Sequence, residues 1–188
     1  VRNPEWTRII LNTVIPLLQK KGFDGLFFDT MDNPVFLEDS NPVLYGGMKT
    51  AALKLIADIR KHHPELKLMM NRGYGLLPQA AENLDMVLAE SFYTDYDFAR
   101  KAPRLAKRAY YHEHLQILQQ SRQANPALGI YTLDYWPPQD EAKVAAIYAL
   151  HRQSGFSPYV STVALNILFQ PPAISSRPAS PEALPAAP

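Results

Sequence analysis

Five short apolar runs in the chain each end on a polar or acidic residue, and stretches with helical periodicity separate them. The runs cover residues 24–29, 66–72, 86–91, 130–135 and 158–161. A strand buried on both faces of a parallel sheet is continuously hydrophobic, and parallel strands are joined by helices. The pattern therefore predicts an α/β fold with a parallel sheet. In such sheets, catalytic and binding residues collect at the carboxyl ends of the strands.

The stretches between these runs carry ordinary helix signals. Asn3 before Pro4 and Glu5 is typical of a helix start, and Gly22 is typical of its end. Four further helices are predicted over residues 47–63, 77–84, 102–124 and 140–154. Because a helix comes first and five strands follow, the chain is expected to cover roughly the last five strand–helix units of a (β/α)8 TIM-type barrel, with the first strands absent. A complete, open five-stranded α/β sheet is the alternative.

The composition changes near residue 170. Residues 1–170 are predicted to form the C-terminal part of the barrel. Residues 171–188 contain six prolines together with Ala and Ser, which is typical of a linker or a disordered tail. A tail of this kind can lead to a further domain.

Charge and composition argue against several classes of function. The net charge of +1 gives no bulk attraction to nucleic acid or to an anionic membrane surface. No apolar run is long enough to span a bilayer. The absence of Cys excludes disulfides, thiolate metal sites and a Cys nucleophile.

Nothing in the sequence indicates a cofactor or a metal. The chain lacks the GxGxxG and GxxxxGK[ST] phosphate loops and the GxSxG nucleophile elbow. All five histidines fall in helical stretches, away from the strand ends: His62, His63, His112, His114 and His151. His112 and His114 are two residues apart, so they point to different faces of a helix and make a poor zinc pair.

The residues at and just after the predicted strand ends supply carboxylate, amide, guanidinium and aromatic groups, a mixture that suits carbohydrate chemistry. The polar ones are Asp29, Asn71, Arg72, Glu90 and Asp134. Glycoside hydrolysis needs two carboxyl groups on opposite sides of one sugar bond, and Asp29 and Glu90 end two different strands.

Each of these acids also has an ordinary structural interpretation. Asp29 can cap the loop that follows it, and Asp32, three residues on in that loop, competes with Asp29 for a catalytic role. Glu90 follows an apolar strand, and burying its carboxylate would cost free energy that a purely structural role does not explain. Asp134 either binds substrate or caps the loop over residues 136–138.

Aromatic and acidic residues after the strands are compatible with an aminosugar polymer. Tyr93, Tyr135 and Trp136 are candidates for stacking on sugar faces, although packing against loops is the ordinary role of such side chains. Because acids follow several strand ends, the site is expected to be acidic and to concentrate a cationic polymer.

An ordered set of segments carries a family resemblance over about residues 1–161. The segments are 22–32 (Gly-Phe-Asp-Gly followed by Asp29 and Asp32), 71–73, 89–91, 133–135 and 155–161. This set resembles the endo-α-1,4-polygalactosaminidases of glycoside hydrolase family 114 and the related hydrolase domains of Pel polysaccharide systems.

The resemblance implies a (β/α)8 barrel that cleaves α-1,4-linked galactosamine or N-acetylgalactosamine polymers internally. It implies Asp29 as nucleophile and Glu90 as acid/base, in a periplasmic or secreted protein. The residues expected to bind the polysaccharide are Asp32, Asn71, Arg72, Tyr93, Asp134, Tyr135 and Trp136.

The sequence thus predicts a retaining endo-glycosidase without cofactor. Two alternatives come from other classes of protein. One is a carbohydrate-binding barrel domain without catalytic activity. The other is a Mg²⁺-dependent barrel enzyme that uses Asp29, Asp32 and Glu90 as oxygen ligands.

Overall fold

The structure, a computed structural model, describes residues 1–172, and the chain divides into two compact units. The first unit contains residues 1–87 and 117–128. The second contains residues 88–116 and continues from residue 129. The predicted tail, 171–188, lies almost entirely outside the described residues and stays a prediction.

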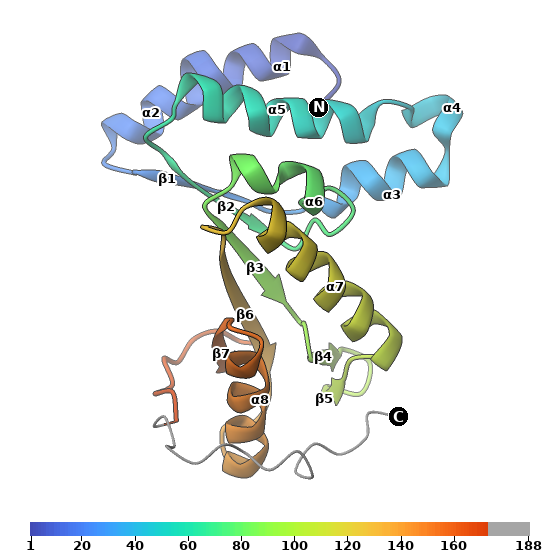
Figure 1. Ribbon diagram of the computed structural model, residues 1–188, viewed down its shortest axis with the longest axis vertical. Helices are drawn as coiled ribbons and strands as arrows, with labels where there is room; N and C mark the ends of the chain where they lie inside the picture. Colours follow the sequence, from blue (N-terminus) through green and yellow to red (C-terminus); the bar gives the residue numbers. More distant parts are fainter. Residues whose placement is uncertain (173–188) are drawn as a thin grey trace. The chain divides into compact units, whose positions relative to one another are not determined.

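All five apolar runs form strands, so the predicted α/β fold class is confirmed. They are β1 (Gly25–Phe28), β2 (Lys67–Asn71), β3 (Met86–Glu90), β6 (Gly129–Tyr135) and β7 (Ser157–Ser161). The hydrogen-bonding order is β1-β2-β3-β6-β7. Within the first unit β1 pairs in parallel with β2, and within the second β6 pairs in parallel with β7 (Figure 1). β3 begins in the first unit and ends in the second.

The first unit begins with a long helix. It comprises α1 (Pro4–Ile9), the π-helical segment η1 (Ile10–Val14) and α2 (Ile15–Lys20). As predicted, the Asn3 side chain accepts a hydrogen bond from the Glu5 backbone N–H at 2.9 Å. Figure 1 shows this helix beside α5 (Met48–His62), and the two are joined where His63 hydrogen-bonds the Leu11 carbonyl at 3.2 Å.

The core of the first unit is built from apolar side chains of the N-terminal helix, α5, β2 and α6. The short helix α6 (Leu77–Ala80) and the 3-10 turn η2 (Ala81–Asn83) lead from β2 to β3. The side chains fully or almost fully buried here include Ile15, Ala52, Ile56, Ile59, Leu68, Met70 and Leu77. These are the apolar positions that the helical and strand periodicities bring to one side.

The segment after β1 is helical, so the expectation that Asp32 lies in a loop was wrong. Asp32 is the first residue of α3 (Asp32–Ser40), which the short α4 (Pro42–Tyr45) follows. An acidic side chain in a first helical turn is stabilised by the positive end of the helix dipole.

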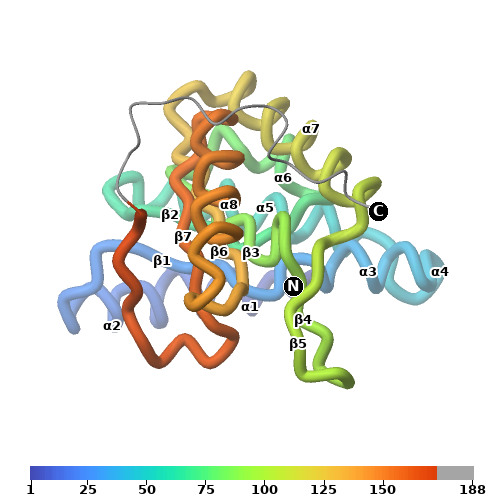
Figure 2. The backbone as a smooth tube through the Cα atoms, turned by 90° about the horizontal axis from the view of Figure 1, so that it is seen from below, coloured from blue at the N-terminus to red at the C-terminus, as the bar shows by residue number. Residues whose placement is uncertain are grey.

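The predicted helix over residues 102–124 begins later than expected. α7 covers Arg108–Ala124, whereas β5 (Ala102–Leu105) pairs antiparallel with β4 (Thr94–Asp97) in a tight reversal of the chain (Figure 2). The Asp97 carboxylate closes the turn because Oδ1 accepts hydrogen bonds from the N–H groups of Ala99 and Arg100, both at 3.0 Å. Pro103 lacks an N–H group and also disfavours a helix interior.

In the second unit, α8 (Glu141–Gln153) packs against β7 (Figures 1 and 2). Asp140 caps the helix because its Oδ1 accepts a hydrogen bond from the Lys143 N–H at 3.1 Å. The buried centre consists of Tyr93, Ile147, Tyr148 and Val160. Across residues 1–172, no helix has the length and hydropathy needed to cross a bilayer.

Arg60 joins the end of α5 to the start of β3. Its guanidinium donates hydrogen bonds to the carbonyls of Asn83 (3.1 Å), Pro64 (3.1 Å) and Leu66 (2.9 Å), and to Asp85 Oδ2 (2.5 Å). Burial raises the pKa of Asp85, but hydrogen bonds from Leu68 and Arg60 and the charges of Arg60 and Lys67 outweigh it, so the pKa is lowered overall.

Replacing Arg60 by Met should therefore lower the free energy of unfolding by about 2–3 kcal/mol, because the partly buried Asp85 carboxylate and the carbonyls of Asn83 and Leu66 lose their partner. Urea denaturation at pH 7 measures this, and Arg8→Met, which removes an exposed pair with Glu5, is the control with no measurable change expected. Because this pKa is lowered, the Asp85 carboxylate stabilises the fold at pH values above its ordinary pKa of 3.8. That contribution is lost as the pH falls below 3.8 and through the lowered pKa of the folded state. The difference between the two proteins should shrink in that range. A difference that persists unchanged there would contradict the electrostatic explanation.

Candidate active site

The predicted site residues are divided between the two units. The first unit holds Asp29, Asp32, Asn71 and Arg72. The second holds Glu90, Tyr93, Asp134, Tyr135 and Trp136. Each group is described from its own contacts.

In the first unit, Asp29 and Asn71 lie side by side at the ends of β1 and β2. Asp29 is exposed, and its Oδ1 accepts hydrogen bonds from the Thr30 N–H (2.8 Å) and from Asn71 Nδ2 (3.1 Å). The parallel pairing of the two strands explains this contact, because it brings their carboxyl ends together. Asp29 therefore caps its loop, as one interpretation expected, and also has its carboxylate oriented by a side chain from the next strand.

Asp32 has a different environment from Asp29. It stands at the start of α3, and its Oδ2 lies 3.5 Å from Nε of Arg72, which follows Asn71. Both side chains are roughly half exposed. A helix start and an ion pair explain an aspartate at this position, so Asp29 is the better candidate for chemistry.

In the second unit, Glu90 at the end of β3 receives a hydrogen bond from Tyr135 at the end of β6. The Tyr135 hydroxyl lies 2.5 Å from Glu90 Oε1. Tyr135 is buried and Glu90 is partly exposed. Burial, followed by the hydrogen bond and charge of Glu90, raises the pKa of the Tyr135 hydroxyl, so Tyr135 stays protonated at neutral pH and donates a hydrogen bond to Glu90.

Asp134 is fully buried, and its carboxylate is hydrogen-bonded to other residues of the second unit. Its Oδ1 accepts hydrogen bonds from the N–H groups of Tyr93 (2.8 Å) and Thr94 (2.6 Å) and from the Thr94 hydroxyl (3.1 Å). Its Oδ2 lies 2.7 Å from Nε2 of His151, which is also fully buried. These contacts differ from the expected cap of the loop over residues 136–138.

Sequence reasoning missed Thr94 and His151. The expectation that every histidine lies away from the strand ends is wrong for His151, whose ring on α8 reaches Asp134. Seventeen residues separate the two, and no local pattern marks their contact.

Two of the predicted aromatic residues, Tyr93 and Trp136, make packing or hydrogen-bond contacts within the protein. Tyr93 is buried, with Tyr111 at 5.5 Å between ring centroids and the Lys143 ammonium 5.3 Å from its ring. The Trp136 indole N–H donates to Asp140 Oδ2 at 2.9 Å, and the Lys143 ammonium lies 5.6 Å from the indole ring. Packing accounts for Tyr93, whereas Trp136 remains partly exposed.

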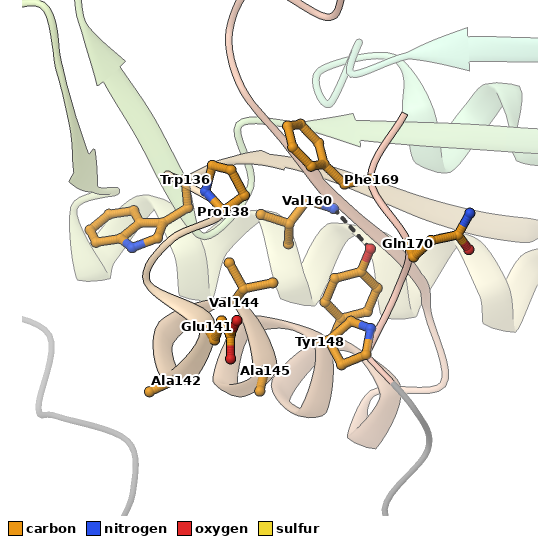
Figure 3. A pocket seen from close by; sticks show the side chains of 11 residues that line it. Trp136, Pro138, Glu141, Ala142, Val144, Ala145, Tyr148, Val160, Phe169 and Gln170 are labelled. Atoms are coloured by element: carbon orange, nitrogen blue, oxygen red, sulfur yellow. Dashed lines mark hydrogen bonds between the residues drawn. The ribbon is translucent and has the colours of Figure 1, made fainter. Parts of the chain in front are cut away.

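A pocket of about 630 Å³ lies in the second unit between α8, the end of β7 and the segment 169–172 (Figure 3). Its lining is largely apolar and includes Val144, Tyr148, Val160 and Phe169. Figure 3 shows the Val160 N–H pointing to the Tyr148 hydroxyl, which accepts it at 3.3 Å. Of the predicted site residues, only Trp136 lines this pocket.

Three strand ends share an unusual backbone conformation. Thr30, Arg72 and Ser91 have φ values of +57°, +54° and +53°, and each directly follows a strand-end residue (Asp29, Asn71 or Glu90). Residues other than Gly seldom adopt this left-handed conformation, which costs of order 1 kcal/mol or more and is concentrated at functional sites. The backbone therefore adopts the same left-handed conformation directly after three of the predicted site residues.

Within residues 1–172, no three His, Asp or Glu side chains are grouped so that they could hold a metal ion.

No curated protein matches the chain significantly. Among solved structures, it is similar to the glycoside hydrolase domain of PelA from Pseudomonas aeruginosa, with 29% identity and a TM-score of 0.72. A variant of that domain matches with 28% identity and the same TM-score. Both matches cover 89% of this chain but only 64% of the other, so the chain spans less than two thirds of those domains. The model of glycoside-hydrolase family GH114 matches residues 1–176, and the chain therefore belongs to that family.

Proposed function

We propose that the protein is a glycoside hydrolase that cleaves an α-1,4-linked galactosamine or N-acetylgalactosamine polysaccharide internally, with Asp29 and Glu90 as its catalytic carboxyl groups. The observation that carries the proposal is the pair of strand-end carboxylates, each oriented by a side chain from the adjacent strand end: Asn71 for Asp29 and Tyr135 for Glu90. Membership of GH114 supports the reaction class.

The proposed reaction has two steps and retains the configuration of the sugar. In the first, Asp29 attacks the anomeric carbon while Glu90 gives a proton to the leaving glycosidic oxygen. In the second, Glu90 takes a proton from a water molecule, and the resulting hydroxyl replaces Asp29 on the anomeric carbon.

The remaining predicted residues are assigned by their exposure. Asp32, Arg72 and Trp136 are exposed or partly exposed and are proposed to contact sugar units. Asn71, Tyr93, Asp134 and Tyr135 are buried and are proposed to support the two carboxyl groups and the surrounding loops.

A cationic aminosugar polymer is the proposed substrate because the strand-end acids carry negative charge. The acids of the β4–β5 hairpin contribute less to this attraction, because Arg104 lies 2.6 Å from Asp95 and 3.9 Å from Asp97. The family resemblance supports a periplasmic or secreted location.

Hydrolysis of the polymer by the full-length protein tests the proposal. The protein is incubated with an α-1,4-linked galactosamine-rich polymer and, separately, with a β-1,4-linked glucosamine polymer, and mass spectrometry follows the released oligosaccharides. We expect a ladder of oligomers from the first polymer only, unaffected by EDTA. Polymer binding without any release would instead indicate a carbohydrate-binding domain, and loss of activity in EDTA would indicate the metal-dependent alternative.

A further inference from the structure

A continuous hydrogen-bonded network in the second unit leads from the buried His151 to the Glu90 carboxylate. Asp134 contacts His151 through Oδ2 and Thr94 through Oδ1. The Thr94 hydroxyl in turn accepts a hydrogen bond from the Tyr135 N–H at 2.9 Å. Tyr135 then donates from its own hydroxyl to Glu90.

The same network holds the chain immediately after Glu90. The Ser91 N–H donates to the Leu133 carbonyl at 2.8 Å, and Asp134 Oδ1 receives the N–H groups of Tyr93 and Thr94. Ser91, which has the left-handed conformation, lies between Glu90 and the two residues held by Asp134. A strained residue of this kind persists only where its surroundings determine its conformation.

Complete burial of Asp134 and His151 costs free energy of desolvation, which hydrogen bonds to the two side chains must offset. Nε2 faces the carboxylate and therefore carries a proton, whereas Nδ1 is buried and has no hydrogen-bond partner among the described residues. The ring is enclosed by Phe92 at 5.3 Å and Tyr93 at 6.3 Å between centroids.

The hydroxyl groups around the pair remain protonated near neutral pH. Burial, followed by the charges of Tyr93 and Asp134, raises the pKa of Tyr111 to about 12. Burial and the charge of Asp134 also raise the pKa of Tyr93. Tyr135 has its pKa raised in the same direction and stays a donor to Glu90.

We propose that Asp134 and His151 are positioning residues that act through Thr94 and Tyr135 to fix the orientation of the Glu90 carboxyl group. This inference rests on the proposed function of Glu90 as the proton donor. Catalytic groups must be held within about 0.5 Å of their productive position, and displacement by about 1 Å can cost on the order of 100-fold in rate. A carboxyl group held through Oε1 by a buried tyrosine meets that requirement.

The first test removes a single hydrogen bond. Tyr135→Phe keeps the ring but removes the donor to Glu90, so kcat of the full-length protein should fall about 10- to 100-fold with KM changed less than about twofold. Tyr131→Phe is the matched control, because Tyr131 lies on the same strand with an exposed side chain, and its kcat should be unchanged. An unchanged kcat in Tyr135→Phe would overturn the inference.

The second test connects His151 to the same effect. His151→Leu leaves Asp134 Oδ2 without its partner and should lower kcat about tenfold, whereas His151→Gln, which can still donate to Asp134, should recover most of that loss. In the Tyr135→Phe background, His151→Leu should lower kcat little further, because the two changes act on one group. Additive losses would show that His151 is merely structural. If His151→Leu does not fold, any loss of kcat in His151→Gln should likewise disappear in the Tyr135→Phe background, and a loss that persists there would overturn the inference.

A structural measurement separates failure of this inference from failure of the proposed function. In a crystal structure of Tyr135→Phe, we expect the Glu90 carboxyl to rotate away from its position in the unsubstituted protein. An unmoved carboxyl would refute the positioning role whether or not the protein hydrolyses the polymer. Absence of hydrolysis by the unsubstituted protein, together with a carboxyl that moves in the variant, would refute only the proposed function.

Discussion

Glu90→Gln is expected to lower kcat for the aminosugar polymer by about 10³-fold or more, because an amide cannot give a proton to the leaving glycosidic oxygen. Gln has nearly the same volume, and its amide oxygen can still accept the hydrogen bond from Tyr135. We therefore expect the fold and the affinity for polymer to be retained. Oligosaccharide release and polymer binding, measured on the same full-length preparation, check both parts.

A matched control and an activated substrate make this prediction specific. Glu113→Gln changes an exposed glutamate on α7 and should leave kcat unaltered. An aryl glycoside with a good leaving group needs little protonation, so Glu90→Gln should still form the covalent intermediate on it, and azide should then release an α-glycosyl azide. Full activity of Glu90→Gln on the polymer would remove Glu90 from the proposed mechanism.

Asp29→Asn should have an effect at least as large, on the order of 10⁴-fold in kcat, because no covalent intermediate can form without a carboxylate nucleophile. Asparagine can still accept from Thr30 and Asn71 through its amide oxygen, so the local structure should persist. Azide should now attack from the face that Asp29 occupied and give a β-glycosyl azide. The opposite configurations of the two azide products would assign nucleophile and acid/base separately.

Two further aspartate variants test which acid is the nucleophile. Asp32→Asn weakens the pair with Arg72 and should raise KM several-fold with a much smaller change in kcat. Asp58→Asn, on α5 beside Lys54, is the neutral control. A loss of kcat in Asp32→Asn larger than that in Asp29→Asn would make Asp32, and not Asp29, the nucleophile.

The strands could be predicted from the sequence because a parallel strand covered on both faces is a continuous apolar run, as residues 86–89 show. The sequence also placed Asp29 and Asn71 at the ends of two strands, and the parallel pairing of these strands explains the contact that the structure adds. The β4–β5 hairpin could not be predicted in this way. Its turn depends on one carboxylate, that of Asp97, which binds two backbone N–H groups beyond the strand.

The parts of the site that sequence reasoning missed depend on contacts between distant residues. In the sequence, Asp134 is a strand-end acid like Glu90. Its contact with His151 exists only because α8 places that histidine beside it. The pairing of Tyr135 with Glu90 likewise joins residues 45 positions apart. The left-handed residues escaped prediction because Thr, Arg and Ser, unlike Gly, carry no signal for that conformation.

The left-handed conformations of Thr30, Arg72 and Ser91 bear on how this protein could adapt to temperature. Glycine at any of them would remove a steric cost of about 1–2 kcal/mol, of which the greater flexibility of the unfolded chain would return only part. Thr30 offers the largest gain because it is β-branched. Yet each substitution would also loosen the backbone beside Asp29, Asn71 or Glu90. If the proposed roles of Asp29 and Glu90 hold, we expect resistance to heat and speed of turnover to oppose each other at these positions, so a thermostable form of the protein would best be sought elsewhere in the chain.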